Sequence, residues 1–212
     1  MSRHVNGRTS GSCVVIVMAK APVPGYAKTR LIPALGAGGA AGLASRLLNH
    51  AVEQALAAQL GTVDLCCAPG PAHIGFAAQA QRAGLVLSSQ VEGDLGTRMS
   101  HAFDRWLPCS DRVLMIGTDA PAIDATLLQQ AAQALEEADA VFVPALDGGY
   151  ALIGLRQSAP QLFVDMVWST ASVMTVTRTR LRSAGMRLTE LAPVADIDEP
   201  ADLVHVPVGW LP

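Results

Sequence analysis

The fold of this chain is decided by C-V-V-I-V-M-A-K-A-P-V-P-G-Y-A-K-T-R-L, which spans residues 13–31. Its first seven residues are all apolar, a pattern typical of a strand buried on both faces of a parallel sheet. Two prolines and Gly25 follow, and they favour an extended, turning backbone over an immediate helix. The loop therefore carries Lys20, Lys28 and Arg30 at the carboxyl end of a central strand, where open α/β sheets bind ligands.

Cations on a loop shaped by proline and glycine suit a polyphosphate. We predict that Lys20, Gly25, Lys28 and Arg30 bind the phosphates of a ligand, and that Lys28 and Arg30 are also catalytic because they neutralise its charge. The alternative for the loop alone is a solvated basic turn.

The composition favours one α/β domain. A chain of 212 residues can bury one substantial core, and only 4% of its residues are aromatic although 50% are hydrophobic. A core made mostly of Ala, Leu and Val fits helices packed on a sheet. We predict a flexible leader at residues 1–12, followed by one domain at residues 13–212.

Charge and cysteine usage narrow the functional class. A net charge of -3 argues against a nucleic-acid surface, so an anionic ligand must be met by local cations. The four cysteines lack C-x-x-C spacing and read as reduced thiols. The leader has no apolar core of a signal peptide, and no apolar run reaches the length of a membrane span. We expect a cytoplasmic protein without a membrane span.

Strands and helices alternate along the chain. The predicted strands are residues 13–19, 63–68, 85–87, 112–117, 139–146, 150–155 and 187–191. The predicted helices are residues 36–60, 72–83, 96–107, 124–137, 160–166 and 171–184, with a last short helix from Glu199. Asp147-Gly148-Gly149 between two strands predicts a hairpin, and hence an antiparallel strand in a mainly parallel sheet.

Two carboxylates are candidates for holding Mg²⁺ or Mn²⁺. Asp119 follows the buried strand at residues 112–117, and Pro121 keeps the backbone from entering a helix at once. Asp198 lies in A-D-I-D-E-P and could face Asp119 across the crevice, with Asp196 as the competing choice. Such cations prefer oxygen ligands and bridge to phosphates. The alternatives are a turn-forming Asp119 and an Asp198 that only caps the last helix.

Three further segments can contribute to a pocket. Gly93, Asp94 and Gly96 would allow close approach to a nucleoside, although a plain connecting loop explains them equally well. Asp147 could accept hydrogen bonds from substrate hydroxyls or act as a general base. The segment W-S-T at residues 168–170 is first a capping sequence and second a minor acceptor-site candidate. No phosphate-loop or dinucleotide-binding motif is present, which disfavours kinase-type and dinucleotide-type sites.

Six motifs in order resemble a bacterial family of small GT-A-fold proteins, which are glycosyltransferases or nucleotide-diphospho-sugar transferases by name and are related to small nucleotidyltransferases. The motifs are M-A-K-A-P-V-P-G-Y-A-K-T-R-L (18–31), G-D-L-G-T-R-M (93–99), G-T-D-A-P (117–121), D-G-G-Y-A-L-I-G-L (147–155), W-S-T (168–170) and D-I-D-E-P-A-D-L (196–203). The resemblance covers nearly all of residues 14–203.

The resemblance implies a three-layer, Rossmann-like GT-A fold that binds a nucleoside phosphate with a divalent metal. Asp119 falls where this fold carries its metal-binding aspartate, but Pro121 replaces the second acid of the D-x-D form. The leading hypothesis is a transferase that uses a nucleotide-activated sugar donor and a small-molecule acceptor. The alternatives are a guanylyltransferase-like enzyme that moves NMP from an NTP to a phosphorylated acceptor, and an idle nucleotide-binding module. A homo-oligomer is compatible with the sequence, which specifies neither base nor acceptor.

Overall fold

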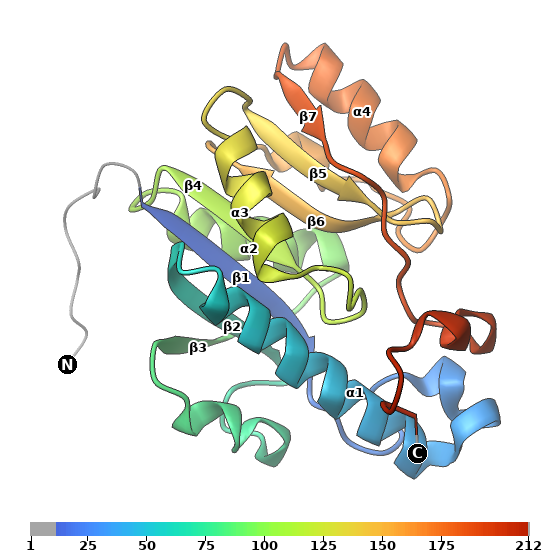
Figure 1. Cartoon of the computed structure of the whole chain (residues 1–212). Helices are drawn as coiled ribbons and strands as arrows, with labels where there is room; N and C mark the ends of the chain where they lie inside the picture. Colours follow the sequence, from blue (N-terminus) through green and yellow to red (C-terminus); the bar gives the residue numbers. More distant parts are fainter. Residues whose placement is uncertain (1–11, 212) are drawn as a thin grey trace.

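A seven-stranded sheet runs through the computed structural model, which describes residues 12–211 (Figure 1). The predicted leader lies outside the described residues except for Ser12. The strand order is β3-β2-β1-β4-β6-β5-β7, and only β6 runs antiparallel to its neighbours. The strands are β1 Cys13–Lys20, β2 Gly61–Ala68, β3 Leu85–Ser89, β4 Arg112–Ile116, β5 Ala140–Pro144, β6 Tyr150–Leu155 and β7 Leu188–Glu190. The predicted mixed, mainly parallel α/β sheet is confirmed.

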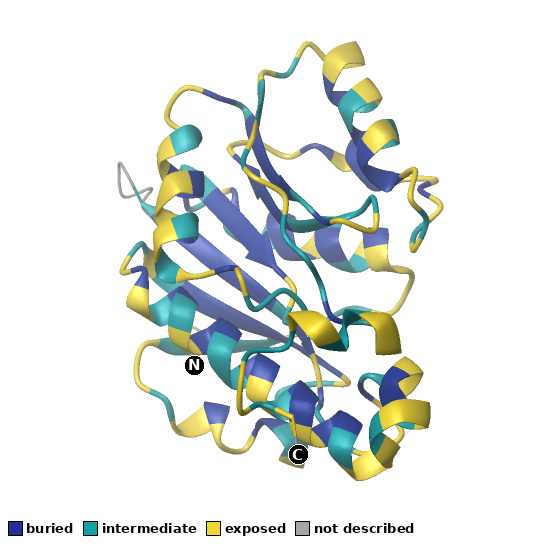
Figure 2. Ribbon diagram, turned by 45° about the vertical axis from the view of Figure 1, so that its right-hand side comes forward, coloured by how far each residue is buried: buried dark blue, intermediate teal, exposed yellow. Residues whose placement is uncertain are grey.

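Helices cover both faces of the sheet and complete three layers (Figure 1). One face packs against α1 (Ile32–Ala57) and α3 (Ala125–Ala134), and the other against α2 (Leu95–Trp106) and α4 (Val173–Ser183). The central strands are buried along most of their length (Figure 2). This burial explains why β1 and β4 read as continuous apolar runs in the sequence.

Helix α1 is long and rich in alanine and leucine. By length and composition alone, the helical stretch at residues 29–57 could cross a membrane, a test that the core helix of a soluble protein also passes. The stretch passes this test because it contains few charged residues. In the fold, α1 buries Leu48 and Val52 against the sheet, as a core helix does. Gly36 has φ 70° and interrupts the helical backbone near its start.

Helix starts follow local side-chain chemistry. Asp124 accepts a hydrogen bond from the backbone N–H of Leu127 at 2.7 Å, so it is the N-cap of α3 and the predicted start of this helix at residue 124 is confirmed. Asp94 caps α2 in the same way through the N–H of Thr97 at 2.8 Å.

Two predicted helices are wrong in extent. Residues 72–83 form only two single turns, Ile74–Phe76 and Gln79–Gln81, because Gly75 weakens a helix there and few side chains in the segment are buried. Residues 160–166 form only Pro160–Leu162, and Asp165 with φ 51° leaves the helical region.

The cysteines are free thiols, as predicted. Cys13, Cys66 and Cys67 are buried, and Cys109 is half-buried. Burial raises the pKa of the Cys13 thiol to about 11 and that of Cys67 to about 12, so both stay protonated and unreactive at neutral pH.

Candidate active site

The topology gathers the candidate residues at one edge of the sheet. Strands β1, β4, β5 and β7 are oriented alike, so their carboxyl ends meet there, and antiparallel β6 begins at the same edge. A cavity of about 500 Å³ opens at this edge. Its lining includes all of the charged candidates except Asp94, namely Lys20, Lys28, Arg30, Asp119, Asp147, Asp196 and Asp198.

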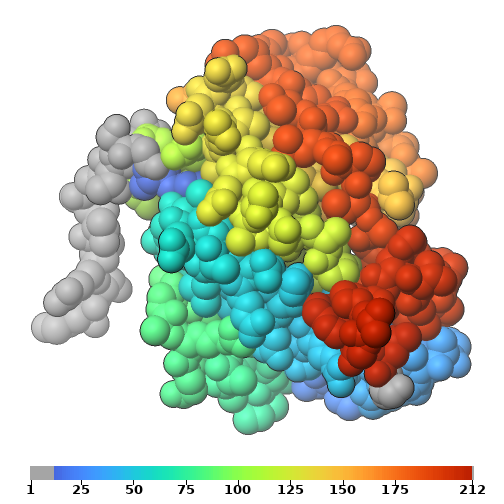
Figure 3. Space-filling model, in the orientation of Figure 1, coloured from blue at the N-terminus to red at the C-terminus, as the bar shows by residue number. Residues whose placement is uncertain are grey.

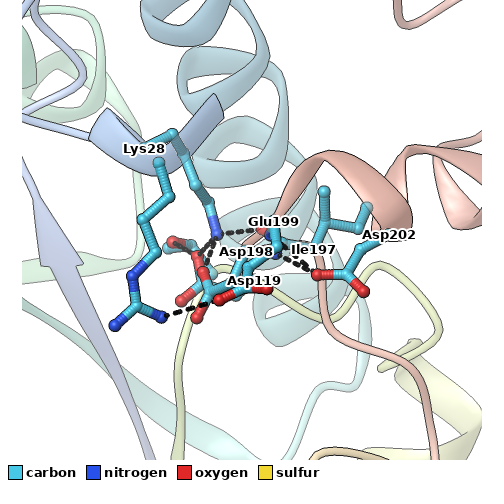
Figure 4. A network of polar contacts seen from close by, with 8 residues as sticks. Lys28, Asp119, Ile197, Asp198, Glu199 and Asp202 are labelled. Atoms are coloured by element: carbon cyan, nitrogen blue, oxygen red, sulfur yellow. Dashed lines mark hydrogen bonds and ion pairs between the residues drawn. The ribbon is translucent and has the colours of Figure 1, made fainter. Parts of the chain in front are cut away.

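The centre of the site is the ammonium group of Lys28, which lies between two carboxylates (Figure 4). Its Nζ is 2.5 Å from Oδ1 of Asp119 and 2.8 Å from Oδ1 of Asp198, and it also donates to the carbonyl oxygen of Ile197. The Lys28 side chain is 7% exposed, whereas the two carboxylate side chains are 44% and 43% exposed. The cation is therefore enclosed, while both acids stay open to the cavity.

The backbone fixes both acids independently of Lys28. The N–H of Ile197 donates to the carbonyl oxygen of Asp119 at 2.9 Å, which ties the segment after β7 to the end of β4. Asp202 accepts from the N–H groups of Asp198 and Glu199 at 3.0 Å and 2.7 Å (Figure 4). Glu199, and not Asp198, is the N-cap of the short helix Pro200–His205, so capping does not occupy the Asp198 carboxylate.

A small apolar cluster holds the segment around Ile197 in place. Ile197 is fully buried and packs with Leu31 from the turn before α1 and with Leu43 and Leu47 from the middle of α1. Figure 3 shows the C-terminal segment in red lying against the blue residues that follow β1. The burial of Ile197 thus fixes where its two neighbours, Asp196 and Asp198, lie relative to the basic loop.

Electrostatics favour the charged form of Lys28. Burial by itself lowers the pKa of the ammonium group, but the charges and hydrogen bonds of Asp119 and Asp198 outweigh it and hold the pKa above its usual value. The carboxylates outnumber the ammonium, so the group of three carries a net negative charge.

The rest of the basic loop lines the cavity beside this group. Arg30 is exposed, with a side chain 3.7 Å from a Glu199 oxygen, a distance at which an exposed pair contributes little. Lys20 is the last residue of β1 and lines the same cavity. Gly25 has φ 78° and shapes the turn, but it does not line the cavity.

Two further carboxylates line the cavity. Asp147 and Asp196 line both the main cavity and an adjoining hollow of about 350 Å³, whose wall also holds Arg30, Asp198, Ser169 and Thr170. Partial burial, followed by the charge of Asp147, raises the pKa of Asp196 to about 6. Oδ1 of Asp147 accepts from the N–H of Gly149 at 2.8 Å, which fixes the hairpin turn. Asp196 faces Asp147, whereas Asp198 shares Lys28 with Asp119.

The loop at residues 93–96 contributes less directly to the cavity than predicted. Asp94 is exposed and engaged in capping α2, where Thr97 also lowers its pKa. A Cβ on Gly96 would lie 2.5 Å from the carbonyl oxygen of Phe163 and 3.1 Å from the Trp168 ring, so close packing requires this glycine. Gly93 has φ 124°, and neither glycine lines the cavity. Leu95, Arg98 and Met99 line it from this side.

Sequence reasoning missed several contributors. Gln90 lines the cavity and ties strands together by donating to the carbonyl oxygens of Ala19 and Cys66. Tyr150 and Thr118 also line it; both stand in quoted motifs, but neither is among the predicted site residues. The position of Asp202 in E-P-A-D is the one available signal, because an acid three residues after an N-cap suits a capping box.

The donor set at Asp119 and Asp198 fits a divalent cation. The two oxygens approach a single cationic atom within 2.8 Å, and both carboxylates open to the cavity. Among residues 12–211 no group of three or more His, Cys, Asp or Glu side chains is arranged as a metal site. Further ligands would have to come from phosphate and water, as is usual for Mg²⁺.

Comparisons with known proteins agree with the fold. A family model described as uncharacterized protein conserved in bacteria (DUF2064) matches residues 51–170. No curated protein matches the chain. The crystal structure of a "putative nucleotide-diphospho-sugar transferase" from Desulfovibrio desulfuricans G20 is 32% identical, with a TM-score of 0.82 over 90% of this chain and 84% of that one.

Two more distant structures share the fold alone. The CMP:2-keto-3-deoxy-manno-octonic acid synthetase in complex with CTP is 13% identical, with a TM-score of 0.58 over 92% of this chain and 96% of that one. Rv0371c from Mycobacterium tuberculosis H37Rv in complex with manganese is 16% identical, with a TM-score of 0.54 over 93% and 98% of the two chains. The family model spans more than half of the sequence and the solved relative matches at 32% identity, so this chain belongs to the DUF2064 family.

Proposed function

We propose that this chain transfers a sugar from a nucleotide-diphospho-sugar donor to a hydroxyl group of a small acceptor, with Mg²⁺ or Mn²⁺ at Asp119 and Asp198. Its broad class is that of a transferase acting on a nucleotide-bearing donor, as its fold relatives indicate. The reduced cysteines agree with a cytoplasmic location.

Lys28 and Arg30 would neutralise the donor phosphates, and Lys20 adds charge at the end of β1. Placing positive groups where charge develops lowers the barrier to departure of a nucleoside diphosphate. A bound divalent cation would supply further stabilisation of that leaving group. The glycine loop before α2 remains the predicted neighbour of the nucleoside, through Leu95 and Arg98, which line the cavity.

The observation that carries sugar transfer is the presence of two further carboxylates, Asp147 and Asp196, in the cavity lining. A hydroxyl acceptor must lose a proton as it attacks, and a carboxylate near it can take that proton. Asp147 is the proposed general base, and its partner Asp196 has a pKa of about 6, near a neutral working pH. A phosphorylated acceptor needs no such base and would meet the negative charge of both carboxylates.

A second candidate is nucleotidyl transfer from a nucleoside triphosphate. The observation that favours it is that three cations of one loop, Lys20, Lys28 and Arg30, all line the cavity, since a triphosphate carries more negative charge than a diphosphate. In this reaction the cations would grip the departing pyrophosphate. The two candidates therefore share the donor end of the site and differ at the acceptor end.

A product assay on purified protein separates the candidates. Donors are first selected by thermal shift with and without Mg²⁺ or Mn²⁺, since a ligand at 100 times its Kd stabilises the folded state by about 2.7 kcal/mol. The proposal expects metal-dependent stabilisation by a nucleotide sugar and release of nucleoside diphosphate with a hydroxyl acceptor. Pyrophosphate release from a triphosphate would favour the second candidate, and binding without turnover of any donor would leave an idle nucleotide-binding module.

Variants test the assigned roles. Asp147→Asn is expected to lower kcat by roughly 100-fold or more with donor binding retained, the usual effect of losing a general base. Asp119→Asn is expected to abolish the metal dependence of donor binding. Exposed Glu137, remote from the cavity, provides a matched control as Glu137→Gln. Unchanged turnover of Asp147→Asn would contradict the assignment of the base.

A further inference from the structure

Lys28 is predicted to bind phosphate, yet its ammonium group is fully engaged elsewhere. It donates to Asp119, Asp198 and the Ile197 carbonyl oxygen, and a lysine ammonium has three N–H donors. With these contacts in place, none of its donors is left for a phosphate oxygen. Lys28 can bind phosphate only after it leaves the two carboxylates.

The ammonium also occupies the position that suits a metal cation. The oxygens that approach Nζ at 2.5 Å and 2.8 Å are the same oxygens that would ligate Mg²⁺ or Mn²⁺. A monovalent ammonium and a divalent cation repel each other strongly at such separations in a partly buried site. The two cations therefore compete for one pair of carboxylates.

We propose that Lys28 excludes divalent cations from Asp119 and Asp198 in the free protein, and that it withdraws only when a phosphate group offers it new acceptors. Metal and phosphate ligand then bind together, each raising the affinity for the other. This inference rests on the proposed function, because it concerns the same donor end of the cavity. It adds an order of events: the free metal binds poorly, and the metal–diphosphate pair binds well.

The surroundings of Lys28 permit this exchange. The acids stay in place without it, because Ile197 N–H holds the backbone of Asp119 and the Asp202 carboxylate holds the backbone of Asp198. Lys28 itself lies on the loop after β1, ahead of the turn Thr29–Leu31. Its long side chain can swing about its own bonds while the acid pair remains fixed.

Binding of Mn²⁺, measured from the electron paramagnetic resonance signal of the free ion, tests the exchange without any turnover. Lys28→Met should bind Mn²⁺ at least 10-fold more tightly than wild type in the absence of any anion. Lys28→Arg keeps the positive charge and should bind as weakly as wild type. Arg182→Gln removes one positive charge from an exposed position in α4 outside the cavity lining and should also resemble wild type.

Pyrophosphate is the second probe, with its own uptake of Mn²⁺ measured in protein-free titrations. It should raise the Mn²⁺ affinity of wild type at least 10-fold and that of Lys28→Met less than 3-fold. Equal Mn²⁺ affinities for wild type and Lys28→Met would overturn the inference, as would equal coupling in both. If Lys28→Met fails to fold, the coupling in wild type and in Lys28→Arg decides, and its absence in wild type overturns the inference.

The two proposals fail in different ways. Failure of wild type to bind pyrophosphate in the presence of metal would remove the donor proposal, while the comparison of Mn²⁺ binding between wild type and Lys28→Met still decides whether Lys28 excludes the cation. Tight Mn²⁺ binding by wild type alone would overturn the exclusion and leave the donor proposal intact.

Discussion

Replacing Asp196 by asparagine is expected to stabilise the fold at pH 8 and to have little effect near pH 4. The carboxyl group is partly buried beside Asp147, and these surroundings raise its pKa from 3.8 to about 6. The negative form is therefore less favourable in the folded state than in the unfolded chain. Asparagine has a similar shape and cannot ionise, so it removes this cost.

The magnitude follows from the two pKa values. A difference between 3.8 and about 6 corresponds to about 3 kcal/mol if the group were fully shielded from water. Because Asp196 is only partly buried, solvent screening reduces this to about 1 kcal/mol. The favourable contribution of protonated Asp196 is fully present below pH 3.8 and is lost as the pH rises through about 6, so the gain from asparagine grows over that window.

Urea unfolding at pH 4.5 and pH 8 measures the effect directly. The expected gain for Asp196→Asn is about 1 kcal/mol at pH 8 and about a third of that at pH 4.5. Glu137→Gln, on an exposed residue away from the cavity, controls for a change of net charge. An equal gain at both pH values, or a loss at pH 8, would refute the reasoning that the negative charge of Asp196 destabilises the folded state.

Other substitutions test the scaffold around the site, each by urea unfolding. Gly148→Ala should cost more than about 2 kcal/mol, because φ is +94° and the new Cβ would lie 2.4 Å from the carbonyl oxygen of Ala171; a neutral result would mean that the hairpin turn can move. Gly154→Ala should cost about 1–3 kcal/mol, since its Cβ would lie 2.5 Å from the nearest core side chain, and full stability would indicate a looser core. Asp124→Ala should cost about 1 kcal/mol through loss of the α3 cap, with Asp124→Ser recovering most of it; equal losses in both variants would argue against capping.

Much of the scaffold is predictable because its signals are local. The apolar runs of β1 and β4 predict buried strands, and Asp124 followed by helix-forming residues predicts the start of α3. The hairpin between β5 and β6 is predictable from Asp147-Gly148-Gly149 for the same reason. In contrast, residues 72–83 have helix-forming composition but little burial, and propensity alone does not hold a helix.

The site is less predictable because its key contacts are long-range. Lys28 and Asp198 are 170 positions apart, and only the packing of the segment after β7 brings them to 2.8 Å. Sequence reasoning identifies both residues as candidates, since each follows a recognisable local pattern. It does not predict that Lys28 binds Asp198, nor that Asp196 lies near Asp147, because both contacts depend on how the segment after β7 packs.

The burial of Ile197 makes the charge geometry of the pocket depend on residues that carry no charge. This side chain packs among leucines from α1 and the preceding turn. Because Asp196 and Asp198 are its neighbours in the chain, the position of Ile197 sets the positions of both acids. A change in the volume of Leu43 or Leu47 would tilt the acid-bearing segment relative to the basic loop. During divergence of the family, substitutions inside a small apolar cluster could thus retune substrate choice while every residue of the pocket wall stays the same.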